Sequence, residues 1–241
     1  MKKLTLMFLF YSTLKSDECI VLAEDEHQHC TKVLRKQLND QIFVTDGKGH
    51  IFTCTIVSIS KNQTQCQIVE TVFKPPVEPG VTIAISPTKN AARIEWFVEK
   101  AVEIGISSIV LFQAKRTEKK SYNPARLEKI MVSAMKQSLN VHLPAISYIQ
   151  NLFELIKTSE QYTHKFIAYC DGPTDQIIHA GHLSGHSIAL IGPEGDFTGE
   201  EINLALAHQF IPVSLGESRL RTETAGIMAL IQMKLKTTQS C

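Results

Sequence analysis

Two glycine-bearing loops in the last third of the chain carry the residue types that point most directly to chemistry. The apolar run 188–191 leads into IGPEGDFTGEE (191–201), and the run 210–213 leads into LGESRLRTETAGIMAL (215–230). An apolar strand that ends in glycine and is followed by a helix is how an α/β sheet builds a ligand crevice at the carboxyl ends of its strands. Two such loops in succession predict one shared binding site.

The first loop places carboxylates where a phosphate would otherwise sit. Glycine-rich loops before helices often bind phosphate through free N–H groups, but Glu194 and Asp196 would repel it, and no GK[ST] motif follows. A neutral or cationic nucleoside, whose ribose hydroxyls donate to a carboxylate, fits better. The alternative is a tight turn with its acids facing water. Thr198 and Glu201 form a capping-box pattern that predicts the start of the next helix.

The second loop carries Arg219 and Arg221 ahead of a mostly apolar helix predicted over 225–235. A guanidinium offers a fixed fork of donors that holds phosphate or polarises a carbonyl. The alternative is that both arginines pair with Glu217 or Glu223. The helix is apolar on a broad face, which is typical of a core or a subunit interface.

Composition predicts a soluble globular protein. The 241 residues are 44% hydrophobic with a formal net charge of +1, which excludes a polybasic protein that binds nucleic acid through bulk charge, so any such contact must use local patches. Candidate patches are the basic clusters at 32–36, at 115–120 and at 219–221. Taken alone, each cluster is more often a solvated surface. The six scattered cysteines are typical of reduced thiols in a cytosolic protein.

Other segments give weaker signals. Lys2-Lys3 and the apolar residues after them imitate a signal peptide, but no small-residue cleavage site follows, and a buried first strand is expected instead. No apolar run is long enough to span a bilayer. His27 and His29 resemble a ligand pair, yet on a helix they would point apart, so no metal site is expected.

The pattern of the chain changes near residue 80. Residues 1–73 are expected to form a small β-barrel with one helix at 24–38 and a hairpin turn at 46–49, and the proline-rich segment 74–80 is the expected linker. Residues 81–241 alternate strands and helices, which predicts an α/β domain with a mainly parallel sheet covered on both faces. The expected strands are 81–85, 109–112, 145–149, 166–169, 188–191 and 210–213, and the expected helices include 91–104, 124–138 and 152–157.

The two loop segments resemble the signature motifs of the RsmE family, which are 16S ribosomal RNA uridine-N3 methyltransferases of the SPOUT superfamily. Less specific matches occur in family order along essentially the whole chain: Phe10-Tyr11, His29 with 33–35, Lys89 with Glu95-Trp96, 100–105, and Gln137-Ser138 with Leu143-Pro144. Six residues precede the segment 7–11 that resembles the usual family start.

The resemblance implies a fold and a set of partners. It implies a PUA-like β-barrel for RNA binding at 1–73, a linker at 74–80, and a SPOUT α/β domain at 81–241 whose carboxy-terminal part threads a trefoil knot. It also implies a cytoplasmic homodimer that uses S-adenosylmethionine and no metal, and that acts on 16S rRNA within the 30S subunit. The donor would be held, chiefly through backbone groups, by Tyr169, Ile191, Gly192, Glu194, Gly195, Leu215, Gly216 and Leu220.

A mechanism follows from this resemblance. Uracil N3 must lose its proton as the methyl group arrives, so the site needs a base or a group that stabilises the developing anion. Arg221 is the candidate for that stabilisation. Glu223 either orients Arg221, acts as the base, or forms a structural ion pair. Lys32, Arg35 and Arg219 are the candidates for RNA contacts.

The chain departs from the commonest family pattern at three positions. Asp196 stands where a third glycine is usual, Lys136 where glutamate is common, and Asn140 where a basic residue is often found. The last two bear on RNA contacts from that helix.

Three other functions remain as alternatives. A non-catalytic RNA-binding or assembly factor would be expected to have degenerate carboxy-terminal loops. A nucleotide-phosphate enzyme would be expected to have a lysine in place of the acids of the first loop. A SPOUT methyltransferase that acts on another RNA would share every motif.

Overall fold

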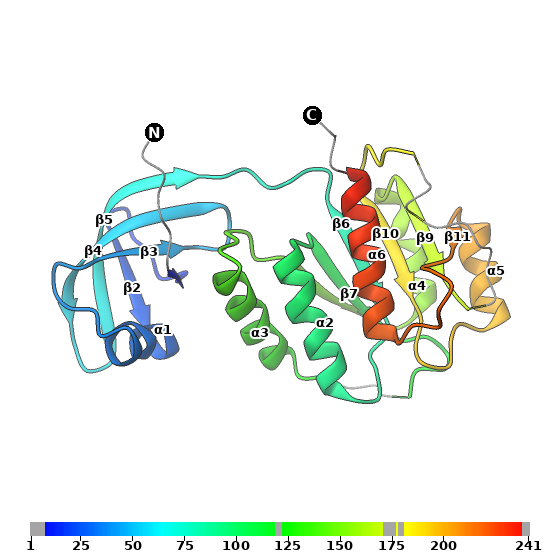
Figure 1. Cartoon of the computed structure of the whole chain (residues 1–241), viewed down its shortest axis with the longest axis horizontal. Coiled ribbons are helices and arrows are strands. Elements are labelled where there is room, and N and C mark those ends of the chain that lie inside the picture. The colour runs from blue at the N-terminus through cyan, green and yellow to red at the C-terminus, as the bar shows by residue number, and fades with distance from the viewer. Residues whose placement is uncertain (1–7, 119–121, 171–176, 178–180, 238–241) are drawn as a thin grey trace. The chain divides into compact units, whose positions relative to one another are not determined.

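The computed structural model describes residues 8–118, 122–170, 177 and 181–237. The chain forms two compact units, the first made of 1–76 with 132–143 and the second of 77–131 with 144–241 (Figure 1). Residues 74–80, between β5 and β6, contain no helix or strand. Residues 1–7 lie outside the described part of the chain.

The first unit contains a curled five-stranded sheet. Its strand order is β1-β3-β4-β5-β2, and β1 is parallel to β3 while the other neighbours are antiparallel. The N–H of Val21 in β2 donates to the carbonyl of Leu14 at 2.9 Å, which joins the chain after β1 to the opposite edge strand. The strands are β1 Leu9–Tyr11, β2 Cys19–Ala23, β3 Gln41–Thr45, β4 His50–Ile59 and β5 Gln63–Phe73.

The interior of this sheet explains the alternating sequence of its strands. Phe10 of β1, Val44 of β3 and Phe52 of β4 are fully or almost fully buried in one cluster, which confirms the expected buried first strand for the part described. The cluster also contains Cys54 and Cys66, and burial raises the pKa of both thiols to about 12. Among the described residues, Cys19, Cys30, Cys54 and Cys66 are free thiols.

The helix predicted over 24–38 is wrong at its end. The structure has α1 at Glu24–Gln28, followed by a single π-helical stretch η1 at His29–Val33. Arg35 then adopts a left-handed conformation with φ of 50°. A right-handed helix cannot continue through such a residue, so the helical segment ends five residues early.

Residues 132–143 belong to the first unit although they follow it by about sixty positions. Lys136 forms an ion pair with Glu26 of α1, and Val141 is buried with Leu9 and Ile51. Asn140 uses its side-chain oxygen to accept the N–H groups of Val141 and His142 at 2.8 and 3.2 Å. The two departures from the family pattern on this segment therefore have local structural partners.

The second unit is a six-stranded, fully parallel sheet, which confirms the predicted architecture. The strand order is β11-β9-β10-β6-β7-β8. Burial of all five residues of both β6 and β10 explains why each strand has four apolar residues and only one small hydroxyl residue, Thr82 or Ser187. The strands are β6 Val81–Ile85, β7 Ser108–Phe112, β8 Ala145–Ile149, β9 His164–Ala168, β10 Ser187–Ile191 and β11 Ile211–Val213.

Helices cover both faces of this sheet. In Figure 1, α2 and α6 lie side by side on one face, where α6 contacts β6 and β10. On the other face, α4 and α5 share a buried cluster with side chains of β7, β9 and β10. The helices that follow β6 along the chain are α2 Ala91–Ile104, α3 Pro124–Gln137, α4 Leu152–Lys157, α5 Gly199–Ala207 and α6 Thr222–Thr237, with a short 3-10 turn η2 at Ser159–Gln161.

The limits of α2 follow from its end residues. The Asn90 side chain accepts the N–H of Ala92 at 3.0 Å and caps the start, and Gly105 ends the helix in a left-handed conformation with φ of 86°. The ammonium of Lys234 in α6 donates to the Gly105 carbonyl at 3.1 Å. Burial lowers the pKa of Lys234.

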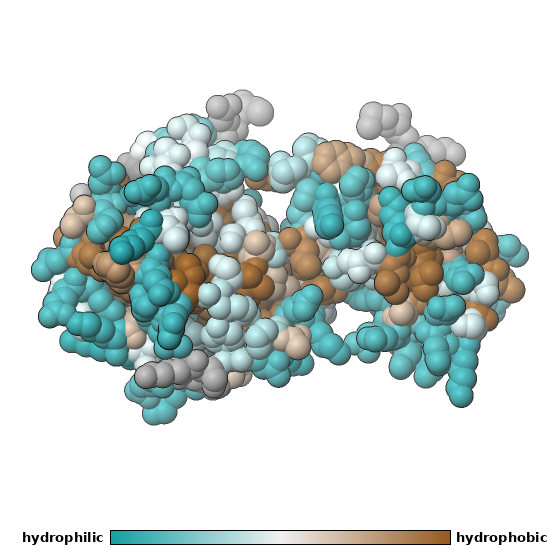
Figure 2. Space-filling model, turned by 180° about the vertical axis from the view of Figure 1, so that it is seen from behind, coloured by the Kyte–Doolittle hydropathy of each residue, from teal (hydrophilic) through white to brown (hydrophobic). Residues whose placement is uncertain are grey.

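Hydrophilic residues cover most of the face seen in Figure 2, broken by groups of hydrophobic residues. None of the helices described is both long enough and apolar enough to cross a membrane.

The contact between α6 and α2 requires a glycine at position 226. A Cβ atom there would lie 2.6 Å from the Phe97 ring and 3.1 Å from the Ile85 side chain. We expect Gly226→Ala to lower the free energy of unfolding by about 1–3 kcal/mol, because a packed core tolerates an added methyl poorly. Denaturant titration followed by circular dichroism measures this change. Gly199→Ala, at the start of α5 with open space around it, is the matched control, and an equal loss in both variants would contradict the assignment.

Candidate active site

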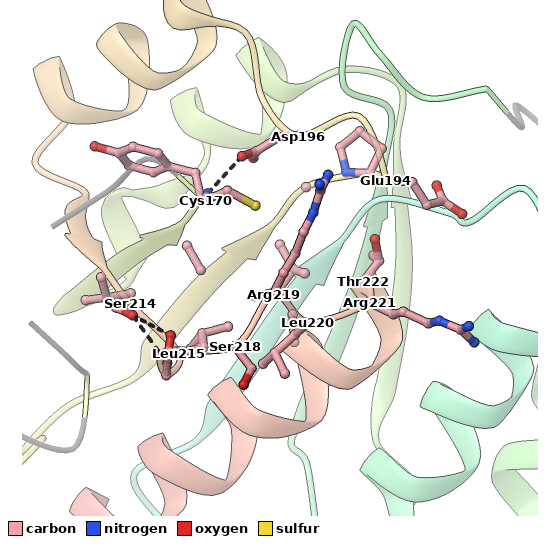
Figure 3. Close-up of a pocket in the computed structure, with 18 of the residues that line it drawn as sticks. Cys170, Glu194, Asp196, Ser214, Leu215, Ser218, Arg219, Leu220, Arg221 and Thr222 are labelled. Atoms are coloured by element: carbon pink, nitrogen blue, oxygen red, sulfur yellow. Dashed lines mark hydrogen bonds between the residues drawn. The ribbon is translucent and has the colours of Figure 1, made fainter. Parts of the chain in front are cut away.

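A pocket of about 770 Å³ lies at the carboxyl ends of the strands of the second unit. Three segments form its walls: 168–170 at the end of β9, 191–194 with Asp196 at the end of β10, and 213–222 from the end of β11 to the start of α6 (Figure 3). The two glycine-bearing loops therefore line a single pocket, which is the arrangement that their sequence predicts. The volume suits a ligand of nucleoside size.

The first loop is a tight turn that leads into α5. The N–H of Asp196 donates to the Pro193 carbonyl at 2.9 Å, and Asp196 has a left-handed backbone with φ of 61°. The predicted capping box is present, with the Glu201 N–H bonded to the Thr198 hydroxyl at 3.3 Å and the Thr198 N–H bonded to the Glu201 carboxylate at 2.8 Å. The start of α5 thereby fixes one end of the loop.

Both carboxylates of this loop bind donors of the protein. Asp196 accepts the N–H of Cys170 at 2.8 Å, shown by a dashed line in Figure 3, and its other oxygen accepts the N–H of Phe197 at 2.7 Å. Glu194 accepts the N–H of Lys89 at 3.1 Å. These carboxylates occupy backbone donors that an anion would need, which agrees with the expected exclusion of a nucleoside triphosphate.

The segment after β7 packs against the outside of the same loop. Arg116 donates to the Gly195 carbonyl at 2.8 Å, and its side chain lies against the Cα of Gly195, where a Cβ would be 3.3 Å from it. The N–H of Lys115 donates to Glu201 at 2.8 Å. The sequence predicted this cluster to be either a local patch for nucleic acid or a solvated surface, because nothing local to residues 115 and 116 indicates a partner about eighty positions away.

The second loop places its two arginines differently. Arg219 extends across the pocket toward the first loop, whereas Arg221 points to the side, toward a neighbouring helix (Figure 3). Both are exposed, and among the described residues neither forms an ion pair. The expected alternative, pairing with Glu217 or Glu223, is therefore absent from this structure.

Glu223 lies behind the pocket wall rather than in it. It is 7% exposed, and the pocket lining contains Thr222 and Ala225 but not Glu223. One carboxylate oxygen is 3.7 Å from Nε of Arg93. The other is buried and has no hydrogen-bond partner among the residues described.

Arg93, in the first turn of α2, is a functional candidate that sequence reasoning missed. Its Nη1 lies 3.9 Å from the carboxylate of Glu194, so that one guanidinium stands between an acid of the first loop and an acid at the start of α6. No sequence signal marks it, because its two partners are more than 100 positions away.

The remaining predicted residues divide between the two units. Gly195 adjoins the pocket without lining it, and Lys32 and Arg35 are exposed residues of the first unit, at and just after η1. The predicted donor-binding residues that line the pocket are Tyr169, Ile191, Gly192, Glu194, Leu215, Gly216 and Leu220.

His27 and His29 have separate environments. The His27 ring is buried and bonded to the Thr64 hydroxyl at 2.9 Å, and the His29 ring packs on Phe10. Within the described ranges, no group of three or more His, Cys, Asp or Glu side chains is arranged to hold a metal ion.

Known proteins are similar to this chain in both sequence and fold. The family model of the RNA methyltransferase domain matches residues 76–234, and that of the RNA methyltransferase PUA domain matches 22–69. A curated relative from Rickettsia conorii, the ribosomal RNA small subunit methyltransferase E, is 29% identical over 93% of each chain.

Two solved structures extend this similarity. A protein described as a probable rRNA-methyltransferase from Porphyromonas gingivalis is 36% identical, with a TM-score of 0.88 over 96% of this chain and 98% of the other. The ribosomal RNA small subunit methyltransferase E of Neisseria gonorrhoeae, solved with S-adenosyl methionine bound, is 27% identical, with a TM-score of 0.83 over 95% and 97% of the two chains.

Proposed function

The chain belongs to the RNA methyltransferase family, within the group named ribosomal RNA small subunit methyltransferase E, and from that premise we propose its reaction. It transfers the methyl group of S-adenosylmethionine to N3 of a uridine in 16S ribosomal RNA, within the 30S subunit. The observation that carries this proposal is the single pocket formed by the end of β9 and the two glycine-bearing loops.

The residues of the pocket fit the proposed donor. The lining combines polar and apolar residues at strand ends, where the backbone leaves the sheet, and its acids disfavour a phosphate ligand. When bound, S-adenosylmethionine supplies an electrophilic methyl group on a positively charged sulfonium. Tyr169, Ile191 and Gly192 form one side of its proposed site, and Leu215, Gly216 and Leu220 form the other.

The chain's own polar groups then act on the acceptor base. Arg219, which crosses the pocket, holds an RNA phosphate or carbonyl, and Arg221 stabilises the anion that develops when uracil N3 loses its proton. The buried carboxylate of Glu223 orients this loop from behind, or accepts the N3 proton once RNA is bound. Lys32 and Arg35, in the first unit, anchor RNA phosphates.

The proposal includes an assembly and a topology. Trp96 of α2 and Ile231 and Leu235 of α6 are exposed by 43%, 39% and 60% on two helices that pack together, and these exposed apolar side chains support a homodimer. After β11, at the edge of the sheet, the chain crosses back so that α6 lies on β6 and β10. We propose that the trefoil knot implied by the family resemblance lies at this crossing. We also propose that residues 1–73 and 81–241 act as RNA-binding and catalytic domains joined by 74–80, in a cytoplasmic enzyme.

The direct test is methyl transfer from radiolabelled donor to 30S subunits that lack the modification and to free 16S RNA, followed by nucleoside mapping. We expect 3-methyluridine in 16S RNA and stronger labelling of the 30S subunit. A calorimetric titration should detect S-adenosylhomocysteine and not ATP. Binding of RNA without any transfer would instead indicate a non-catalytic assembly factor, and label in a different RNA would indicate a different substrate.

The proposed role of Arg221 predicts a loss of rate without a loss of donor affinity. We expect Arg221→Gln to lower the single-turnover methyl-transfer rate by about 10²- to 10³-fold, the usual effect of removing a donor that stabilises a developing anion. Affinity for S-adenosylhomocysteine should stay within about twofold. Unchanged transfer would eliminate this role.

Glu223→Gln in the same assay decides between the two proposed roles of Glu223, orienting the loop and accepting the N3 proton, because loss of a general base costs at least about 10²-fold.

The proposed phosphate contacts predict a change in salt dependence. Replacing both Lys32 and Arg35 with alanine should lower the slope of log affinity against log salt by about 1.5, because each lost phosphate contact removes about 0.7–0.9. Filter binding to 16S RNA at several salt concentrations measures this slope, and donor affinity should not change. Lys48→Ala/Lys61→Ala, which removes two exposed lysines of the same unit, is the control. An equal slope in wild type and the Lys32/Arg35 variant would reject the assignment.

A further inference from the structure

The two acids of the first loop bond to the loop's neighbours, and this suggests a role for them beyond contact with a ligand. We propose that Asp196 and Glu194 are positioning residues that fasten the first loop to the other two walls of the pocket. This inference rests on the proposed function, because it assumes that the pocket holds the methyl donor.

Asp196 fastens the first loop to the end of β9. Its carboxylate accepts the N–H of Cys170 at 2.8 Å, and Cys170 directly follows Tyr169 on the first wall of the pocket. Since Asp196 and Cys170 are 26 positions apart in sequence, this bond joins two separate segments. The same side chain also accepts the N–H of Phe197, which fixes its rotamer.

Glu194 fastens the opposite side of the same loop through Arg93. Glu194 accepts the N–H of Lys89, just before α2, at 3.1 Å and lies 3.9 Å from the Arg93 guanidinium. Arg93 is in turn 3.7 Å from Glu223, at the point where the second loop becomes α6. This chain of charges connects the first loop to the base of the second.

The backbone at Asp196 allows a clean separation of positioning from folding. Its φ of 61° is a conformation that glycine adopts freely and that other residues adopt at a cost. Asp196→Gly therefore removes the bond to Cys170 and relieves backbone strain in the same step. Stability should change little, while the two walls lose their connection.

Loose walls reduce affinity because binding must then order them. A ligand that meets preorganised walls avoids this entropic cost. The effect should be similar for S-adenosylmethionine and S-adenosylhomocysteine, which differ in charge at sulfur, because both need the same wall geometry. If the Asp196 carboxylate instead contacted the sulfonium directly, removing it would lower the affinity for S-adenosylmethionine and leave the affinity for S-adenosylhomocysteine unchanged.

The first experiment compares Asp196→Gly with Asp196→Asn by calorimetry, using both ligands. We expect Asp196→Gly to weaken both by about three- to tenfold, the effect of losing one hydrogen bond, with a melting temperature equal to or above that of wild type. Asp196→Asn should weaken both ligands less than Asp196→Gly does, because its amide oxygen still accepts the Cys170 N–H and asparagine tolerates this backbone, although its NH2 group cannot accept the Phe197 N–H. KM for the donor should rise in Asp196→Gly while kcat stays constant.

The second experiment is a double-mutant cycle on Arg93 and Glu194. Arg93→Gln and Glu194→Gln should each weaken S-adenosylhomocysteine binding by about two- to fivefold, and the double variant should lose little more than either single one. Arg93→Lys should restore part of the affinity. Arg126→Gln is the matched control, because Arg126 pairs with Glu95 at 3.3 Å and neither residue lines the pocket.

Each outcome has one meaning. If wild-type protein fails to bind S-adenosylhomocysteine, the proposed function itself fails. If wild type binds but Asp196→Gly binds equally well, or the cycle is fully additive, the positioning role is wrong. If both Asp196 variants weaken S-adenosylmethionine alone, the carboxylate contacts the charged sulfonium and the positioning role is again wrong.

Discussion

The parallel register of three neighbouring strands is the constraint on which the whole site depends. Ala168 of β9 is the register partner of Ile191 in β10 and of Val213 in β11. All three residues line the pocket, and each is followed directly by one of its walls. Because parallel strands end at the same edge of a sheet, segments from positions about 168, 191 and 213 meet without any further device. The candidate site of this chain is built at that edge of the sheet.

Much of the second unit could be predicted from the sequence because local signals and tertiary packing agree there. The predicted limits of 91–104, 145–149 and 152–157 are those of α2, β8 and α4. Asn90, Gly105 and Asn151 are cap residues whose preferences are local. The helix predicted over 24–38 was wrong because its end depends on a π turn and on a left-handed arginine. An arginine seldom adopts that conformation, so residue type gives no warning of it.

The candidate site was predictable to the level of loops and not to the level of contacts. Glycine placement and the capping box identified both loops, since these signals are within a few residues of each other. Arg93 and Arg116 contact the first loop from segments about 80 to 100 positions away, and only the assembled sheet brings them there. The same holds for Glu223, whose position behind the pocket wall follows from the packing of α6 against α2.

The distribution of charge around the pocket explains how one site can accept a cationic donor beside a polyanionic RNA. The acids of the first loop bond to backbone N–H groups and to Arg93, so their charge is partly neutralised within the protein. Arg219 and Arg221 are exposed and have no ion-pair partner among the described residues, so they remain available to an anion. Negative charge is thus held on the loop that follows β10, and positive charge is presented by the loop that precedes α6. The free positive charge of the second loop is therefore presented to an anionic RNA, while the acids of the first loop are already bonded and hold that loop in place.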